Sequence, residues 1–141
     1  MACLVGGRCG DDDTAEMIQF ELPWPPSVNT YYRHLSRGPM AGRTLISAKG
    51  RTYRQDCIAS LYEQNVPTGR YIGKLGLVIA AYPPDRRKRD LDNLLKATLD
   101  ALVFAKVIKD DGDIDELGIA RREVTPGGRL VLRLGNVSAM Q

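Results

Sequence analysis

The residues with the clearest chemical potential lie between positions 86 and 96. Four consecutive cations come directly before Asp90 and Asp92, and Asn93 and Lys96 follow shortly after. The four cations are Arg86, Arg87, Lys88 and Arg89. Cations hold a phosphate backbone, and carboxylate oxygens are the ligands that Mg²⁺ prefers. This pattern is what a metal-dependent nuclease requires, with the basic run for binding and the acidic group for cutting.

A site that cleaves a phosphodiester needs oxygen ligands for the metal and a cation for the charge that develops on phosphorus. Asp90, Asp92 and Asp111 could provide the oxygens. Lys96 could orient water or stabilise the charge, and the Asn93 amide could hydrogen-bond a metal ligand. Each residue has an ordinary alternative, because Asp90 could be a helix N-cap and Asp92 could form an i,i+4 ion pair with Lys96.

A strand and a helix are expected to position this group. Residues 75–81 form an almost continuous apolar run, which is typical of a central strand covered on both faces, and Pro83 and Pro84 end it. A helix is predicted from about 91 to 105, with Asp90 as its N-cap. Its apolar face comprises Leu91, Leu94, Leu95, Thr98, Ala101 and Leu102. A short strand at 107–108 then leads to Asp111.

The N-terminal part divides into a leader and a strand. Residues 1–16 are glycine-rich and acidic and are expected to form a flexible leader that ends before Met17. Apolar and polar residues alternate over 18–22, which predicts a half-buried strand. The segment 23–34 combines prolines, aromatics and cations that could stack on bases and touch phosphate, Arg33 and His34 among them. The alternative is that its aromatics, Trp24 and Tyr31, pack on the core.

A second helix is predicted behind the loop at 35–42. Ser47 is its expected N-cap, and the helix runs to about Gln64. Lys49 and Arg54 lie in its first two turns, where cations oppose the helix dipole. Their position indicates an anionic partner such as DNA, and the alternative is a merely solvated helix face. The side chains expected to be buried are Tyr53, Cys57, Ile58, Leu61 and Tyr62. Residues 116–124 and 129–134 are interpreted as a hairpin around the turn 125–128.

Composition limits the possible classes. The chain has 141 residues, of which 43% are apolar and 26% charged, so a single globular domain is expected over 17–135, with 136–141 as a tail. No apolar run approaches the ~20 residues of a membrane span, and no secretory signal is evident, so we expect a cytoplasmic protein without a membrane partner. Three cysteines without a CxxC motif and one histidine argue against a zinc site.

Four sequence blocks, taken together and in order, resemble the RusA family of Holliday-junction resolvases of bacteria and their prophages. The likeness covers about residues 17 to 135. The blocks are residues 22–34, residues 84–96, Asp110 with Asp111, and residues 125–129. They read LPWPPS with Asn29 and YYRH, then PDRRKRDLDN with Lys96, then DD, and finally TPGGR.

The resemblance implies a homodimeric, Mg²⁺-dependent endonuclease that acts in DNA recombination and repair. Family members cut four-way junctions by paired symmetric nicks that leave 5′-phosphates, and their fold is a small α+β domain with a mixed sheet and two main helices. Their essential aspartates correspond by motif position to Asp90, Asp92 and Asp111, and their essential lysine to Lys96. Two alternatives stay open, which are a metal nuclease for other branched DNA and a non-catalytic DNA-binding protein of phage origin.

Two further expectations follow from the resemblance. Lys106 stands where the family pattern has a glycine that closes the catalytic helix, and a left-handed backbone there costs lysine about 1 kcal/mol more than glycine. A homodimer also needs an apolar surface, for which the strand at 18–22 and the hairpin at 116–134 are candidates. The hairpin residues in question are Leu117, Ile119, Leu130, Leu132 and Leu134.

Overall fold

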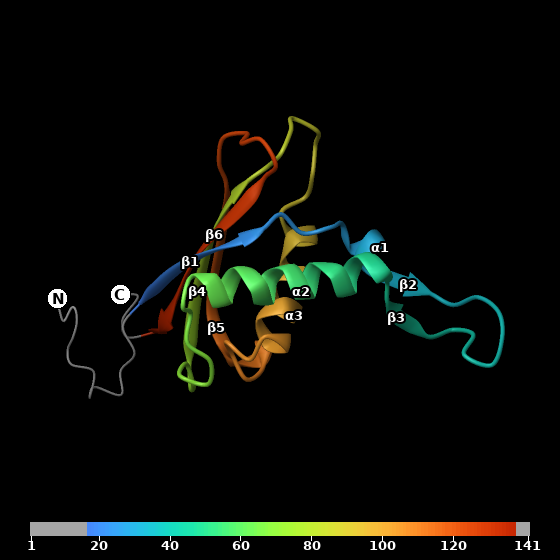
Figure 1. The fold of residues 1–141 in the computed structure, drawn as a ribbon, viewed down its shortest axis with the longest axis horizontal. Helices are drawn as coiled ribbons and strands as arrows, with labels where there is room; N and C mark the ends of the chain where they lie inside the picture. Colours follow the sequence, from blue (N-terminus) through green and yellow to red (C-terminus); the bar gives the residue numbers. More distant parts are fainter. Residues whose placement is uncertain (1–16, 138–141) are drawn as a thin grey trace.

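Four strands form a mixed sheet in the computed structural model, which describes residues 17–137 (Figure 1). The strands are β1 (Ile18–Pro23), β4 (Leu75–Tyr82), β5 (Ile114–Arg121) and β6 (Arg129–Asn136). Their order is β1-β6-β4-β5, and β6 pairs antiparallel with both β1 and β4, whereas β5 pairs parallel with β4. The mixed sheet confirms the expected α+β class.

The remaining elements are helices and one small hairpin. The helices are α1 (Val28–Tyr31), α2 (Ala48–Glu63), α3 (Asp92–Phe104) and the 3-10 turn η1 (Asp111–Asp113). The strands β2 (Tyr32–His34) and β3 (Thr44–Ile46) pair antiparallel in a hairpin where only a loop was expected over 35–42. Figure 1 shows this hairpin extending away from the sheet, beyond the N-terminal end of α2.

The helices cover only one face of the sheet. In β4, Leu75, Leu77, Ile79 and Ala81 are at most 1% exposed, whereas Val78 between them is 39% exposed. The prediction of a strand covered on both faces is therefore wrong. The apolar run hides this difference because small and apolar residues also occupy the uncovered face of β4, at positions 76, 78 and 80.

The predicted hairpin at 116–134 is also wrong, because β4 lies between β5 and β6. The chain after β5 stays at the end of β4, where the Arg122 and Thr125 amides donate to the carbonyls of Ala81 and Pro83. The turn at 125–128 is real, with the Gly128 amide donating to the Thr125 carbonyl at 2.8 Å. Local turn chemistry predicts where the chain reverses, but it does not reveal which strand lies beside which.

α2 forms as predicted, but two side chains expected in its core are not buried, since Ile58 is half-buried and Tyr62 is exposed. The Ser47 hydroxyl accepts from the Gly50 amide at 3.0 Å and caps the helix. Tyr53, Cys57 and Leu61 are buried, but Tyr62 is 83% exposed, because it lies about 100° around the helix from Leu61 and outside the buried stripe. Burial raises the pKa of the Cys57 thiol to about 12, so this side chain stays a protonated part of the core.

α3 ends at a left-handed residue, at the position where the family pattern has a closing glycine. Lys106 has a φ of 65°, its amide donates to Val103, and the Val107 amide donates to Leu102. This arrangement closes the helix with the geometry that usually takes glycine. The predicted strand that follows is reduced to one bridge, in which Ile108 pairs with Tyr71.

We expect Lys106→Gly to raise the free energy of unfolding by about 0.5–1 kcal/mol, because glycine adopts a positive φ without strain. Urea denaturation measures the change. The matched control is Asn65→Gly, since Asn65 also has a positive φ, of 59°, but asparagine tolerates it better. A Lys106→Gly chain that is less stable than the wild type would contradict the expected strain.

Two expectations concern parts of the chain outside the described residues. The leader at 1–16 and most of the tail at 136–141 lie there, and β6 itself ends at Asn136, one residue past the expected domain. Within residues 17–137, none of the helices has both the length and the apolar character that crossing a membrane demands.

Candidate active site

The start of α3 presents the chemically important side chains. Asp92 is the first helical residue, and Asn93 and Lys96 follow within its first two turns, all three exposed. The N-cap position belongs to Leu91 rather than to the predicted Asp90. Asp90 contributes its backbone carbonyl, which accepts from the Asn93 amide at 3.2 Å. The Asp90 carboxylate is therefore not used to cap the helix and remains exposed for another role.

Two neighbouring hollows adjoin these side chains. The Asp92 hollow, of about 570 Å³, lies between α3 and the β2–β3 hairpin. It is lined by Tyr32, His34, Thr44, Asp92, Asn93 and Lys96. The Asp90 hollow, of about 440 Å³, includes Trp24, Ser27, Lys88 and Asp90. Asn93 lines both hollows and is therefore shared by the Asp90 side and the Asp92 side of this surface.

Asp111 lies at the end of the α3–β5 connection, directly before β5. It opens η1, which contacts α3. Burial raises the pKa of Tyr32, and the negative charges of Asp100 and Asp111 raise it further. Tyr32 therefore remains a neutral phenol on the wall of the Asp92 hollow, and the charge of Asp111 acts on it.

The candidate ligands are of the type that Mg²⁺ prefers, but their side chains are not grouped into a preformed metal site. Asp90, Asp92 and Asp111 are exposed carboxylates, which are the hard oxygen ligands that Mg²⁺ takes. Among residues 17–137, no three acidic, histidine or cysteine side chains are grouped closely enough to hold a metal. Carboxylates repel one another, so bringing these three together requires a cation. Neither Asp92 nor Lys96 takes part in the ion pairs of the described residues, so the ordinary i,i+4 pair is not formed.

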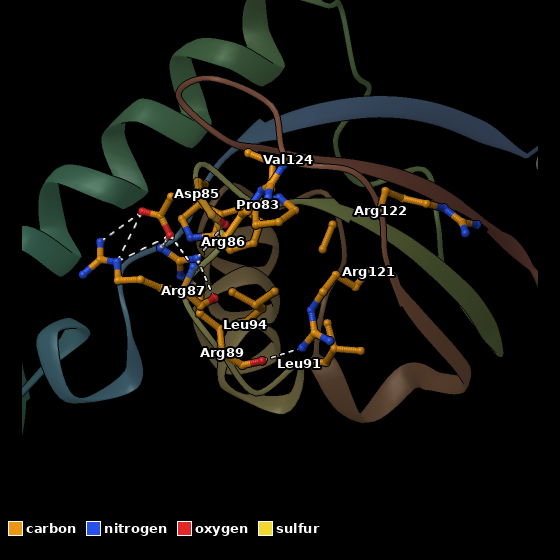
Figure 2. A pocket seen from close by; sticks show the side chains of 12 residues that line it. Pro83, Asp85, Arg86, Arg87, Arg89, Leu91, Leu94, Arg121, Arg122 and Val124 are labelled. Atoms are coloured by element: carbon orange, nitrogen blue, oxygen red, sulfur yellow. Dashed lines mark hydrogen bonds and ion pairs between the residues drawn. The ribbon is translucent and has the colours of Figure 1, made fainter.

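The basic run does not act as four equal cations. Figure 2 shows Arg87 and Arg89 both joined to the carboxylate of Asp85. The Arg89 side chain is only 22% exposed, pairs with Asp85 at 2.8 Å, and lies 5.7 Å from the centre of the Trp24 ring. Hydrogen bonds from the Arg87 amide and then its guanidinium lower the pKa of Asp85 to about 2. Arg86, Arg87 and Lys88 are the exposed members of the run.

The Trp24 ring lies beneath the Arg89 guanidinium of the basic run. It is half-buried against the core, which agrees with the packing alternative for the aromatic residues. Gly128 has a φ of +67°, and a Cβ there would lie 2.9 Å from Pro84 and 3.0 Å from the Trp24 Cβ. Three blocks that are distant in the sequence therefore meet at one point, which requires glycine at position 128.

Sequence reasoning missed two arginines beside the basic run. Arg121 and Arg122 end β5 and begin the next loop, and they line a pocket of about 210 Å³ with Arg86 and Arg89. Figure 2 shows Arg121 reaching toward the Arg89 carbonyl, to which it donates a hydrogen bond, and Arg122 pointing away. Their only sequence signal is a pair of adjacent arginines inside the predicted strand 116–124, which the structure ends at Arg121.

Three helices are joined by a partly buried polar cluster beside the site. The Tyr31 hydroxyl donates to the Asp100 carboxylate, and an Arg54 nitrogen lies 2.6 Å from the same oxygen. The Arg54 guanidinium also lies 4.5 Å from the centre of the Phe104 ring. Arg54, a predicted DNA ligand, therefore has partners inside the protein, whereas Lys49 in the first turn of α2 is exposed. Tyr31 is fully buried, as the packing alternative proposed.

We expect Asp100→Ala to lower the free energy of unfolding by about 2–3 kcal/mol, because it leaves the mostly buried Arg54 without its carboxylate. The side chains of this pair are 18% and 30% exposed. The control is Glu21→Ala, which removes the exposed pair with Arg129 and should cost about 0.5 kcal/mol or less. Denaturant unfolding of both chains gives the comparison, and equal losses would contradict the assigned burial of the cluster.

Comparison with known proteins identifies the family of this chain. The sequence model of the family described as Endodeoxyribonuclease RusA matches residues 23–134. A crossover junction endodeoxyribonuclease RusA of Enterobacteria phage 82 is 42% identical over 113 residues, covering 80% of this chain and 89% of the relative. The protein of that name from Escherichia coli K12 is 41% identical over the same shares, and that of Enterobacteria phage HK97 is 38% identical over 122 residues, covering 86% and 97%.

The matched span runs from the end of β1 through the Trp24 loop, the helices, β4 and β5 to most of β6. It contains the three aspartates, Asn93 and Lys96. The named relatives are endodeoxyribonucleases, and the match covers most of both chains. This chain belongs to the RusA family of endodeoxyribonucleases.

Proposed function

We propose that this chain is a Mg²⁺-dependent endonuclease that resolves four-way DNA junctions by paired, symmetric nicks during recombination and repair. The observation that carries the proposal is the exposed group of Asp92, Asn93 and Lys96, which faces a hollow at the start of α3. Asp90 lines the neighbouring hollow together with Asn93, and the charge of Asp111 acts on Tyr32 of the Asp92 hollow, which supports assigning the three carboxylates to one site. The relatives named as crossover junction endodeoxyribonucleases support the substrate class.

The residues divide the chemistry between them. Asp90, Asp92 and Asp111 would hold Mg²⁺, which when bound polarises the phosphate and lowers the pKa of a water ligand. The ammonium of Lys96 offsets the negative charge that develops on the phosphate oxygens. The Asn93 amide orients the carboxylates on either side of it. Hydrolysis forms a bond from water oxygen to phosphorus and breaks the P–O3′ bond, which leaves a 5′-phosphate and a 3′-hydroxyl.

Binding is assigned to the exposed cations around this group. Arg86, Arg87 and Lys88 hold the DNA backbone next to Asp90, and Arg33, His34 and Lys49 extend the contact. A purely DNA-binding protein would place the exposed carboxylates of Asp90 and Asp92 where they repel phosphate. Those carboxylates gain a function only when a metal ion lies between them and the DNA, which favours the enzyme over the non-catalytic binder.

A two-fold homodimer is part of the proposal, because one domain offers one candidate site and a four-way junction must be cut on two strands. The sheet leaves surface available for pairing. Its uncovered face includes Val78, and Leu117 on the edge strand β5 is 44% exposed. The hairpin leucines considered from the sequence, Leu130, Leu132 and Leu134, cannot serve, because they are fully buried beneath the helices.

Mg²⁺-dependent nicking of a synthetic junction tests the function. The junction is incubated with the full chain beside a linear duplex and a flapped duplex of the same sequence, with EDTA as the metal-free control. We expect nicked duplex products with 5′-phosphates from the junction and none from the linear duplex. Preferred cutting of the flap would support the alternative branched-DNA nuclease, and cutting in EDTA would contradict the metal assignment.

A further inference from the structure

The β2–β3 hairpin with its connecting loop, residues 32–46, forms an arm of unusual charge. It carries Arg33, Arg37, Arg43 and the only histidine of the chain, His34, and it contains no acidic residue. Most of its residues are exposed, and Figure 1 shows it standing clear of the sheet. A projecting cationic segment without a compensating carboxylate fits an anionic partner.

The two faces of the arm differ. Tyr32 pairs with Ile46 and His34 pairs with Thr44, so these four side chains share one face of the hairpin. Arg33 and Leu45 pair with each other on the opposite face, where Leu45 is 38% exposed. Two cations that are adjacent in the sequence, Arg33 and His34, therefore point in opposite directions.

The inner face of the arm and the start of α3 are the two walls of the Asp92 hollow. Tyr32, His34 and Thr44 line one side, and Asp92, Asn93 and Lys96 line the other. The Thr44 hydroxyl lies 2.9 Å from Nδ1 of His34 and orients its ring. The aromatic ring is thus on one wall, and the metal ligand and ammonium are on the other.

The base of the arm is held firmly in place. The Tyr32 ring packs edge-on against Tyr31, with 4.8 Å between ring centres and 79° between planes. Tyr31 donates to Asp100 of α3, and the Ser47 amide donates to the Tyr31 carbonyl at 2.9 Å. Tyr32 therefore has a fixed position relative to α3.

We propose that the arm and α3 form a groove for one unpaired DNA strand, with a base stacked on Tyr32 and its phosphate directed to the Lys96 ammonium on the opposite wall. A base inside a duplex has its faces covered by its neighbours, so it reaches this ring only where pairing is interrupted. The exchange point of a branched DNA offers such bases, and base–aromatic stacking is independent of sequence. This inference rests on the proposed function and names how the scissile strand is held.

Binding by the full chain in EDTA tests the groove without cleavage. The probes are a single-stranded oligonucleotide, a blunt duplex, and a four-way junction with 2-aminopurine at the exchange point. We expect Tyr32→Ala to weaken single-strand binding about tenfold and to remove the protein-dependent change in 2-aminopurine fluorescence. The same variant should bind the blunt duplex less than twofold more weakly than the wild type, because paired bases do not stack on the Tyr32 ring.

Variants on the same arm provide the controls. Tyr32→Phe keeps the ring and should bind like the wild type, and Leu45→Ala lies on the outer face and should also have no effect. Thermal unfolding shows whether Tyr32→Ala folds; if it does not, Tyr32→Leu keeps an apolar contact with the core but offers no ring. Equal losses for the Tyr32 and Leu45 variants, or an equal loss for duplex and single strand, would overturn the proposal.

The outcomes separate this inference from the proposed function. A wild-type chain that cuts the junction with Mg²⁺, while Tyr32→Ala binds and cuts equally well, would refute the groove and leave the resolvase intact. A wild-type chain that cuts no junction, while Tyr32→Ala loses single-strand binding, would refute the resolvase and retain the groove.

Discussion

The Asp92→Asn chain should lose Mg²⁺-dependent cleavage of a four-way junction by about a thousandfold while still binding it. Asparagine keeps the size of the side chain but removes the charge that a metal ion requires, and it also removes a carboxylate that repels phosphate. Cleavage is measured on radiolabelled junction, and binding is measured by electrophoretic shift in EDTA. Binding should be unchanged or tighter.

The control for this experiment is Asp115→Asn, an equivalent change at an exposed aspartate of β5 that lines neither hollow. It should cut like the wild type. Co-expressed wild-type and Asp92→Asn chains extend the test to the dimer, because mixed dimers should nick one strand and let nicked junction accumulate. Normal cleavage by Asp92→Asn alone would show that the metal site is wrongly placed.

Replacing Arg86, Arg87 and Lys88 together by alanine should weaken junction binding by about 10- to 100-fold near 0.1 M salt. Each phosphate contact that is lost releases one fewer counterion, so the slope of log K against log salt should become shallower by about 2–3. Filter binding over a series of salt concentrations measures both effects. The carboxylates remain, so cleavage at saturating protein should persist.

Arg70→Ala with Lys74→Ala provides the control, since these cations precede β4 and so lie at the opposite end of that strand from the run. Their removal should leave the salt slope almost unchanged. Arg89→Ala should behave differently from the other members of the run, because Arg89 pairs with Asp85 and covers Trp24. An unchanged slope in the triple variant would assign DNA binding to another surface.

Local signals predicted the elements that carry the site, because the physical causes are local. Ser47 begins α2 through its own hydroxyl, as a local capping signal predicts. The apolar stripe of α3 also agrees with its buried residues, among them Leu94, Ala101 and Leu102. Such features depend on neighbours within a few positions in the sequence.

Long-range contacts explain what the sequence could not reveal. The insertion of β4 between β5 and β6 depends on contacts between segments that are tens of residues apart. Arg54 and Arg89 have the residue type of a DNA ligand, but Asp100 and Asp85 already engage them. The different faces of Arg33 and His34 follow from the pairing of β2 with β3 on either side of the predicted loop, which the sequence did not predict.

The shared attachment of the arm and α3 has a mechanical consequence for the proposed groove. The hydrogen bond from Tyr31 to Asp100 joins the start of the arm to α3. The two walls of the groove are therefore held together at this point, and their separation cannot adjust freely to the DNA. The groove then favours DNA that is easily deformed at the exchange point, since a strand must bend out of its helix to enter. A junction whose exchange point is loosened by mismatches should be cut faster than one locked by strong pairing, even when both bind equally well.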